Sequence, residues 1–217
     1  MRVIFEFNAG KNYICWGFYL IPNCRLMKRL ALFASGSGTN AENLIRYFAD
    51  SKYARVSLIL CNNPEAFVIK RAKNHNVPVM TFSRSQFYDS SEVLGILEGH
   101  KIDFIVLAGF LWLVPTNILE AFPRSIINIH PALLPKYGGK GMYGNRVHEA
   151  VIQNGEEESG ITIHLIDEQY DQGQTLFQTT CPVYPDDDSQ TLAARIHKLE
   201  YAHFPEVIED FVKETQD

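Results

Sequence analysis

Two polar residues, Asn128 and His130, interrupt the apolar segment Ile127-Asn128-Ile129-His130-Pro131. Residues two apart along a strand point to the same side, so both side chains should project together. Burying both without partners would cost on the order of a few kcal/mol, which favours a functional pair over two structural residues. An amide beside an imidazole can hydrogen-bond a developing oxyanion and exchange a proton with an amine. The pair therefore predicts a reacting centre at the end of a strand.

The acidic segment Asp167-Glu168-Gln169-Tyr170-Asp171-Gln172-Gly173 is a second candidate. Many such segments are only solvated turns. An Asp near an imidazole, however, favours the imidazolium and raises the pKa of the His, which would suit His130 as an acid. Our hypothesis is that Asp171 serves the reacting centre in this way. His148 and His164 lack an equivalent constellation, and we expect both to be structural or peripheral.

The glycine-rich loop Ser35-Gly36-Ser37-Gly38-Thr39-Asn40 follows an apolar strand and leads into a helix. Glycines let the backbone approach an anion, and a helix N-terminus offers free N–H groups, so the loop predicts a phosphate cradle. With Ala41 it also fits the G-x-G-x-x-A pattern of dinucleotide sites. That function needs an acid after the second strand, where Cys61-Asn62-Asn63 offers no carboxylate. The simplest alternative is a tight turn with Thr39 or Asn40 as helix cap.

Short apolar runs alternate with longer amphipathic segments, as in β-α units around a parallel sheet. We therefore predict one doubly wound, mostly parallel α/β sheet with an antiparallel edge. Expected strands cover residues 30–34, 56–61, 104–107 and 126–129, with an edge pair at 160–166 and 176–183. Expected helices cover residues 41–50, 65–74, 91–99, 145–154 and 189–213, the last bent or interrupted at Pro205.

Composition narrows the function classes. The 217 residues are 46% hydrophobic and 21% charged, the balance of one globular domain, and the net charge of -5 attracts neither nucleic acid nor an anionic membrane. Four cysteines without paired spacing favour a reducing, cytoplasmic location. The chain has no H-E-x-x-H, no cysteine pair at ligand spacing and no G-x-S-x-G, so we expect neither a metal site nor a serine hydrolase.

Residues 1–26 are predicted to be an N-terminal extension or a misassigned start. Their aromatic run is broken early by Gly17, lacks a signal-peptide cleavage site and is too short to span a bilayer. Met27 stands directly before the first predicted strand of the α/β domain. We therefore assign residues 27–217 to the catalytic domain.

The motifs together resemble the phosphoribosylglycinamide formyltransferases, a folate-dependent family of purine biosynthesis. The similarity runs from about Met27 to the last helix. Its most specific stretches are residues 34–40, Val106-Leu107-Ala108-Gly109-Phe110, residues 128–137 and residues 167–173. The resemblance implies a Rossmann-type fold that moves the formyl group of 10-formyltetrahydrofolate, a co-substrate, onto the amine of glycinamide ribonucleotide.

The resemblance also implies roles for individual residues. Asn128 and His130 would flank the formyl carbon, and Asp171 would organise water and charge around the His. The substrate phosphate and ribose would be held by Gly38, Thr39, Asn40, His197 and Glu200. The folate would be bound by Leu111, Trp112, Leu113, Val114, Asn128, Asp167, Glu168, Gln169, Tyr170 and Asp171.

The sequence departs from the family pattern in several places. Ser90-Ser91 stands where bacterial relatives commonly have an Arg near the folate glutamate tail, so another residue would have to supply that contact. The loop of residues 138–144 is rich in glycine, His197 replaces a Gln, and Trp112 is unusual for the pterin wall. None of these changes removes a reacting group.

Related activities share this chemistry. A methionyl-tRNA formyltransferase would carry a further C-terminal domain and a basic surface, and a formyltetrahydrofolate deformylase would carry an N-terminal regulatory domain. A non-enzymatic folate-binding module is a further alternative, which the intact Asn, His and Asp disfavour. We expect small-molecule substrates, no nucleic acid or membrane partner, and a monomer or homodimer.

Overall fold

The computed structural model describes residues 13–16, 19–22 and 27–215. Within the predicted extension, β1 (Tyr13–Trp16) and β2 (Tyr19–Pro22) pair antiparallel as a separate two-stranded sheet. The rest of that extension lies outside the described residues.

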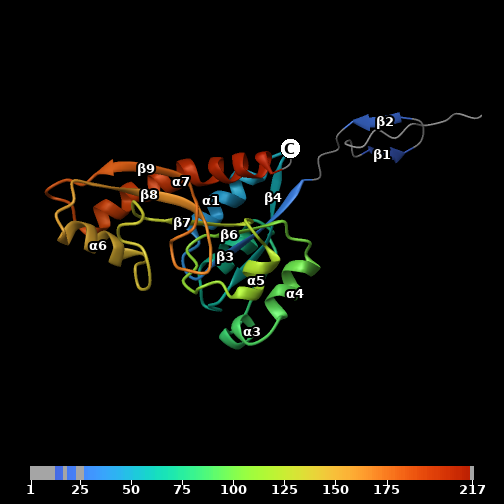
Figure 1. Ribbon diagram of the computed structural model, residues 1–217, viewed down its shortest axis with the longest axis horizontal. Coiled ribbons are helices and arrows are strands. Elements are labelled where there is room, and N and C mark those ends of the chain that lie inside the picture. Colours follow the sequence, from blue (N-terminus) through green and yellow to red (C-terminus); the bar gives the residue numbers. More distant parts are fainter. Residues whose placement is uncertain (1–12, 17–18, 23–26, 216–217) are drawn as a thin grey trace, which may run out of the picture.

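Between residues 27 and 215, seven strands form one sheet in the order β5-β4-β3-β6-β7-β8-β9 (Figure 1). They are β3 (Lys28–Ala34), β4 (Ala54–Cys61), β5 (Val79–Thr81), β6 (Phe104–Leu107), β7 (Ile126–His130), β8 (Glu158–Leu165) and β9 (Thr175–Pro182). Strands β3, β4, β5, β6 and β7 are parallel to one another, whereas β8 and β9 run antiparallel at one edge of the sheet. The predicted fold class and the antiparallel edge are confirmed.

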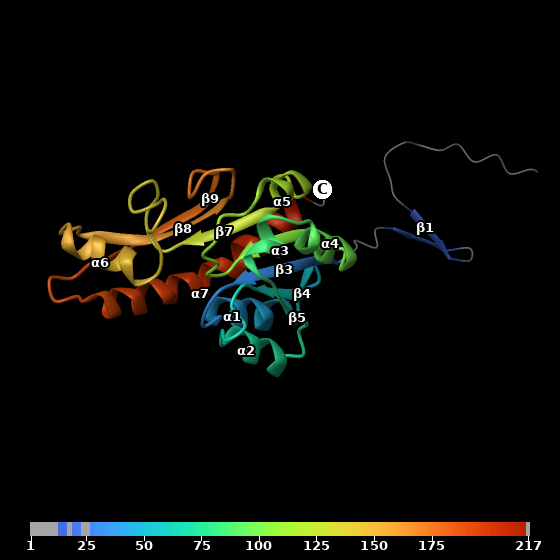
Figure 2. The same ribbon diagram turned by 90° about the horizontal axis from the view of Figure 1, so that it is seen from below.

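Helices cover both faces of this sheet (Figure 2). One side carries α1 (Thr39–Phe48), α2 (Val68–Asn74) and α7 (Ser189–Glu214), with α6 (Asn145–Gln153) beside α7. The other side carries α3 (Arg84–Tyr88), α4 (Glu92–Gly99) and α5 (Thr116–Ala121). No helix in the described part of the chain is long and apolar enough to cross a membrane.

Strand β3 shows why the sequence folds in this way. Leu30, Leu32 and Ala34 belong to the core under α1 and α7, whereas Ala31 and Phe33 belong to the core under α3 to α5. Alternate side chains thus enter opposite cores, and both faces must be apolar. The five residues are at most 1% exposed.

Helix α7 runs without interruption through Pro205, which excludes one of the two predicted effects, an interruption rather than a bend. A proline lacks an N–H, which leaves the carbonyl four residues earlier, on Tyr201, without its helical donor. The side-chain amide of Asn43, on α1, donates to this carbonyl at 3.0 Å. A bond between two helices therefore replaces one within the helix.

Candidate active site

The carboxyl ends of β3, β6 and β7 open into one cavity of about 640 Å³. Ligands of open α/β sheets bind at this edge, and the volume suits a small-molecule site. The walls are formed by the segments after the three strands, by loop 139–144, by the segment after β8, and by α6 and α7. Every binding or reacting residue predicted from the sequence lines this cavity except Glu168.

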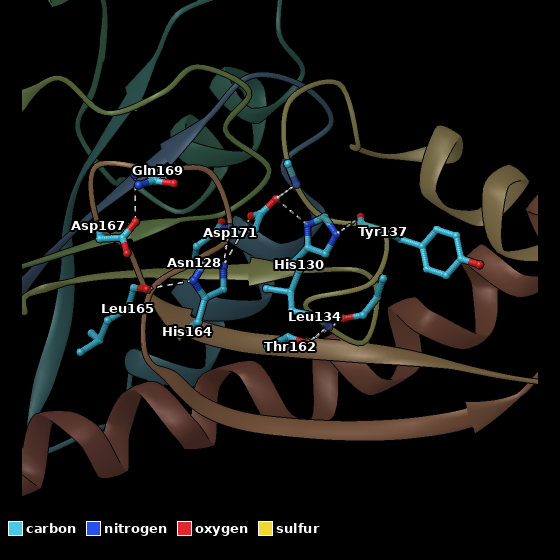
Figure 3. A network of polar contacts seen from close by, with 12 residues as sticks. Asn128, His130, Leu134, Tyr137, Thr162, His164, Leu165, Asp167, Gln169 and Asp171 are labelled. Carbon is cyan, nitrogen blue, oxygen red and sulfur yellow. Dashed lines mark hydrogen bonds and ion pairs between the residues drawn. The ribbon is translucent and has the colours of Figure 1, made fainter.

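Asn128 is held by His164, a residue that we had expected to be structural or peripheral. His164 lies opposite Asn128 on β8, and its Nδ1 donates to the Leu165 carbonyl at 2.9 Å. In the neutral ring Nε2 is then an acceptor, and the Asn128 amide nitrogen donates to it at 3.1 Å (Figure 3). This bond fixes the amide and leaves its second N–H for a ligand. Of the two roles expected for His164, structural or peripheral, this contact supports the structural one.

His130 is 4% exposed and has a defined partner at each ring nitrogen. Its Nε2 donates to the Tyr137 carbonyl at 2.7 Å, so Nδ1 faces the Asp171 carboxylate, whose Oδ2 is 3.6 Å away (Figure 3). Burial lowers the pKa of His130, and the charge of Asp171 opposes this shift only in part. Asp171 acts in the predicted direction, but burial outweighs it, so the neutral imidazole is the favoured form.

Asp171 connects the two histidines. Its Oδ1 lies 3.6 Å from His164 Nε2, and its Oδ2 accepts from the Gly139 N–H at 2.9 Å. Burial alone would raise its pKa, but the charge of His130 and the Gly139 bond lower it. Asp171 is therefore a carboxylate. A Cβ on Gly138 would lie 3.2 Å from the Asp171 Cβ, so this close approach depends on a glycine.

The phosphate cradle predicted after β3 is a preformed helix N-terminus. Gly38 is the N-cap of α1 with φ 72° and ψ 26°, and no described side chain caps the helix, so the expectation of Thr39 or Asn40 as its cap was wrong. A Cβ at Gly38 would lie 2.8 Å from the Val68 Cα, and the φ also favours glycine. Arg71 on α2 braces the loop, since its Nε donates to the Ser37 carbonyl at 2.9 Å.

The cradle continues into α7 through a buried carboxylate. Glu200 is 4% exposed and accepts from the Asn40 amide at 2.9 Å and from His197 Nδ1 at 2.8 Å. The bond to Glu200 raises the pKa of His197 despite its partial burial. Within the part of the chain that the structure describes, the Asn40 Oδ1 has no donor. Polar groups of α1 and α7 therefore converge beside the expected phosphate position.

Comparisons with known proteins agree with this geometry. The family model described as "Formyl transferase" matches residues 28–208. The chain belongs to the formyl transferase family. It is 32% identical to "Phosphoribosylglycinamide formyltransferase" of Bacillus subtilis over 86% of this chain and 95% of that protein. It is 38% identical to the solved "glycinamide ribonucleotide transformylase 1 from Geobacillus kaustophilus", with a TM-score of 0.78 over 86% and 99% of the two chains.

A plant relative is longer. The chloroplastic "Phosphoribosylglycinamide formyltransferase" of Vigna unguiculata is 39% identical over 86% of this chain, which spans 62% of that protein. The formyl transferase described here thus covers less than two thirds of the plant protein's length.

His148, which we expected to be structural or peripheral, lines the active-site cavity of this formyl transferase. It is 3% exposed, and its Nδ1 has no hydrogen-bond partner among the residues that the structure describes. Burial, with a smaller effect of His197, lowers the pKa of His148 to about 4. Its position on α6 at the cavity was not evident from the sequence, because nothing in the sequence indicated that α6 packs against α7.

The segment expected to bind the pterin is fixed on the far side of the cavity. The Leu111 N–H donates to Ser35 Oγ at 3.1 Å, and the Tyr88 hydroxyl donates to the Leu113 carbonyl at 3.0 Å. Trp112 packs within about 6 Å, ring to ring, of a cluster made by Phe82, Phe87, Tyr88 and Phe110. This formyl transferase therefore presents an apolar wall that is hydrogen-bonded to the start of its polar cradle loop.

Proposed function

We propose that this protein transfers the formyl group of 10-formyltetrahydrofolate to the amine of glycinamide ribonucleotide. The products would be formylglycinamide ribonucleotide and tetrahydrofolate, in de novo purine biosynthesis. One observation carries the proposal: a single cavity joins an anion cradle, an amide–imidazole–carboxylate group and an apolar wall. Relatives that bear the name of this activity support it.

Different walls of the cavity bind different parts of the two substrates. Gly38, Thr39 and Asn40 bind the phosphate through N–H groups at the start of α1, and Glu200 with His197 binds the ribose. The folate occupies the wall formed by the segment after β6. Its pterin contacts Leu111, Trp112, Leu113 and Val114, and the segment of Asp167, Gln169, Tyr170 and Asp171 closes over it.

The reaction is a direct transfer in which the neutral amine of the ribonucleotide attacks the formyl carbon. The carbonyl π electrons move to oxygen, and the free N–H of Asn128 stabilises this oxyanion. His130 is neutral, so its Nδ1 accepts the proton that the attacking nitrogen loses. The nearby Asp171 carboxylate stabilises the resulting imidazolium.

The proton then returns from His130 to N10 of the folate as the bond between N10 and the formyl carbon breaks. The oxyanion collapses to the new formamide, and tetrahydrofolate leaves. No covalent enzyme intermediate is required. This differs from the protonated His130 that the sequence suggested, because burial favours the neutral ring before the amine attacks.

The acceptor is tested by offering purified protein 10-formyltetrahydrofolate with glycinamide ribonucleotide, with initiator methionyl-tRNA, or with water alone. We expect that, of the three acceptors, only the ribonucleotide is formylated. Release of formate in water would instead indicate a deformylase, and formylation of the tRNA another member of the family. Absence of all three reactions with intact folate binding would indicate a non-enzymatic module. The cytoplasmic location and the monomer or homodimer remain part of the proposal.

A further inference from the structure

His148 is a buried histidine of the cavity to which the proposed reaction assigns no role. It lies on α6 beside Val147 and close to one turn before Val151, which are at most 1% exposed, so this face of the helix is packed. The Asn145 amide at the start of α6 donates to the Ser189 hydroxyl at the start of α7 at 3.1 Å. The contact between the two helices therefore fixes the place of His148 beside the cavity.

The two nitrogens of the His148 ring differ in their surroundings. Nδ1 is enclosed and has no hydrogen-bond partner among the described residues. Nε2 has no partner among those residues either, but it is not enclosed, and the ring lines the cavity. A proton on Nδ1 would be a buried N–H with no acceptor, whereas a proton on Nε2 can reach a ligand, so the Nε2–H tautomer is favoured. Because burial keeps the ring neutral at neutral pH, His148 offers the cavity one N–H donor.

Glu200, on α7, has one oxygen left for the same part of the cavity. Its Oε2 accepts from the Asn40 amide and from His197 Nδ1. Its Oε1 accepts from none of the described residues and is not enclosed by them. The charge of Glu200 acts on the pKa of His148, after the larger effects of burial and of His197, so the two side chains lie near each other. An uncharged donor and a carboxylate acceptor therefore line one part of the cavity together.

This pair is suited to a neutral group with two adjacent hydroxyls. A second anion beside the Glu200 carboxylate would be repelled, and the phosphate has its own cradle at residues 38–40. One hydroxyl of a diol can donate to Glu200 Oε1 while its neighbour accepts from His148 Nε2. The ribose of a ribonucleotide presents two such hydroxyls.

We propose that His148 donates from Nε2 to one hydroxyl of the ribose of glycinamide ribonucleotide and so determines specificity for ribose over deoxyribose. The inference rests on the proposed function, because it takes this ribonucleotide as the ligand of the cavity. A site built to bond a hydroxyl discriminates against a ligand that lacks it, because the N–H is then left without an acceptor. His148 is a specificity residue and takes no part in the proton transfers of the reaction.

The test measures the binding of glycinamide ribonucleotide and of its 2′-deoxy and 3′-deoxy analogues by isothermal titration calorimetry. His148→Met in the full chain removes the donor and should weaken binding of the ribonucleotide roughly tenfold. Binding of the analogue that lacks the hydroxyl bonded by His148 should not change, because that analogue has already lost the bond. His148→Gln, which keeps an N–H donor, should bind the ribonucleotide with intermediate affinity. His100→Met changes a partly exposed His outside the cavity, so this control should bind all three ligands normally.

The outcomes separate the two proposals. Equal weakening of all three ligands by His148→Met would make His148 a structural support of the cavity and overturn the inference. Equal binding of the three ligands by the unaltered protein would overturn it as well, and that comparison needs no substitution. If the unaltered protein formylates the ribonucleotide while His148→Met binds it normally, only this inference fails. If the unaltered protein binds none of the three ligands, the proposed function fails and this inference fails with it.

Discussion

Asp171 Oδ2 lies 3.6 Å from His130 Nδ1, the ring nitrogen that faces away from the Tyr137 carbonyl. The carboxylate raises the pKa of the imidazole, while burial lowers it by more. The pair is therefore set to accept a proton and to stabilise the cation that results. Such an arrangement keeps the imidazole neutral in the resting protein and stabilises its positive charge once it has accepted a proton in the reaction.

Asp171→Asn keeps the shape of the side chain and removes its charge. The pKa of His130 should then fall further, so the acid limb of kcat/KM moves to lower pH. The imidazolium loses its stabilisation in the transition state, and kcat should fall roughly a hundredfold or more while both substrates still bind. NMR titration of His130 beside a pH–rate profile measures both effects. Asp50→Asn, an exposed charge change after α1, is the control, and a normal titration with normal turnover would remove Asp171 from the reaction.

The cradle allows a paired test of two neighbouring glycines. Gly38→Ala places a Cβ against the backbone of Val68 at a φ of 72°, so the loop must shift and the KM for the ribonucleotide should rise roughly tenfold or more. Gly36→Ala meets nothing within 4 Å and should have a much smaller effect. Steady-state kinetics for both substrates, with thermal midpoints, is the measurement. Loss of folate binding in Gly38→Ala would show that this loop binds the folate and not the ribonucleotide phosphate.

Much of the site followed from the sequence because its residues lie at the ends of apolar strands. Asn128 and His130 are polar at positions two apart, and a parallel sheet brings its strand ends to one edge. His164 was missed because its role depends on the register between β7 and β8, which places it opposite Asn128. Thr162 and His164 are also two apart, and that matching spacing is the signal that could have revealed the pairing.

The elements that were missed are short. Strand β5 has three residues, α3 five and α5 six, too few to establish a period in an apolar pattern. Helix α3 begins instead at a local capping box, in which Ser83 and Gln86 exchange side-chain and backbone hydrogen bonds. The protonation state of His130 could also not be predicted from the sequence, because it depends on how deeply the fold buries the ring.

Removal of residues 1–26 should leave stability and turnover unchanged. Among the described strands β1 and β2 pair only with each other, whereas β3 begins at Lys28 and is paired on both sides by β4 and β6. A chain that starts at Met27 is therefore expected to keep its thermal midpoint and kcat. Large decreases in both would show that the extension stabilises the catalytic domain.

His148 makes stability sensitive to mild acid. Its pKa is lowered to about 4 in the folded chain, whereas an unfolded His titrates near its ordinary value of 6.5. Between these two values the unfolded chain binds the extra proton, so stability is complete above the upper value and decreases as pH falls toward the lower one. At pH 5 the loss of stability from this residue should be about 2 kcal/mol.

His148→Gln removes this titration and keeps a polar side chain of similar reach. Urea unfolding at pH 7.5 and at pH 5 should therefore give a smaller difference in unfolding free energy for the variant than for the unaltered protein. Contributions from carboxylates and from the other histidines are largely common to both proteins, so the comparison isolates His148. His100→Gln, which changes a partly exposed His after α4, is the matched control and should leave the pH difference as it is. If the unfolding free energy decreases equally between pH 7.5 and pH 5 in His148→Gln and in the unaltered protein, His148 is not the acid-sensitive group.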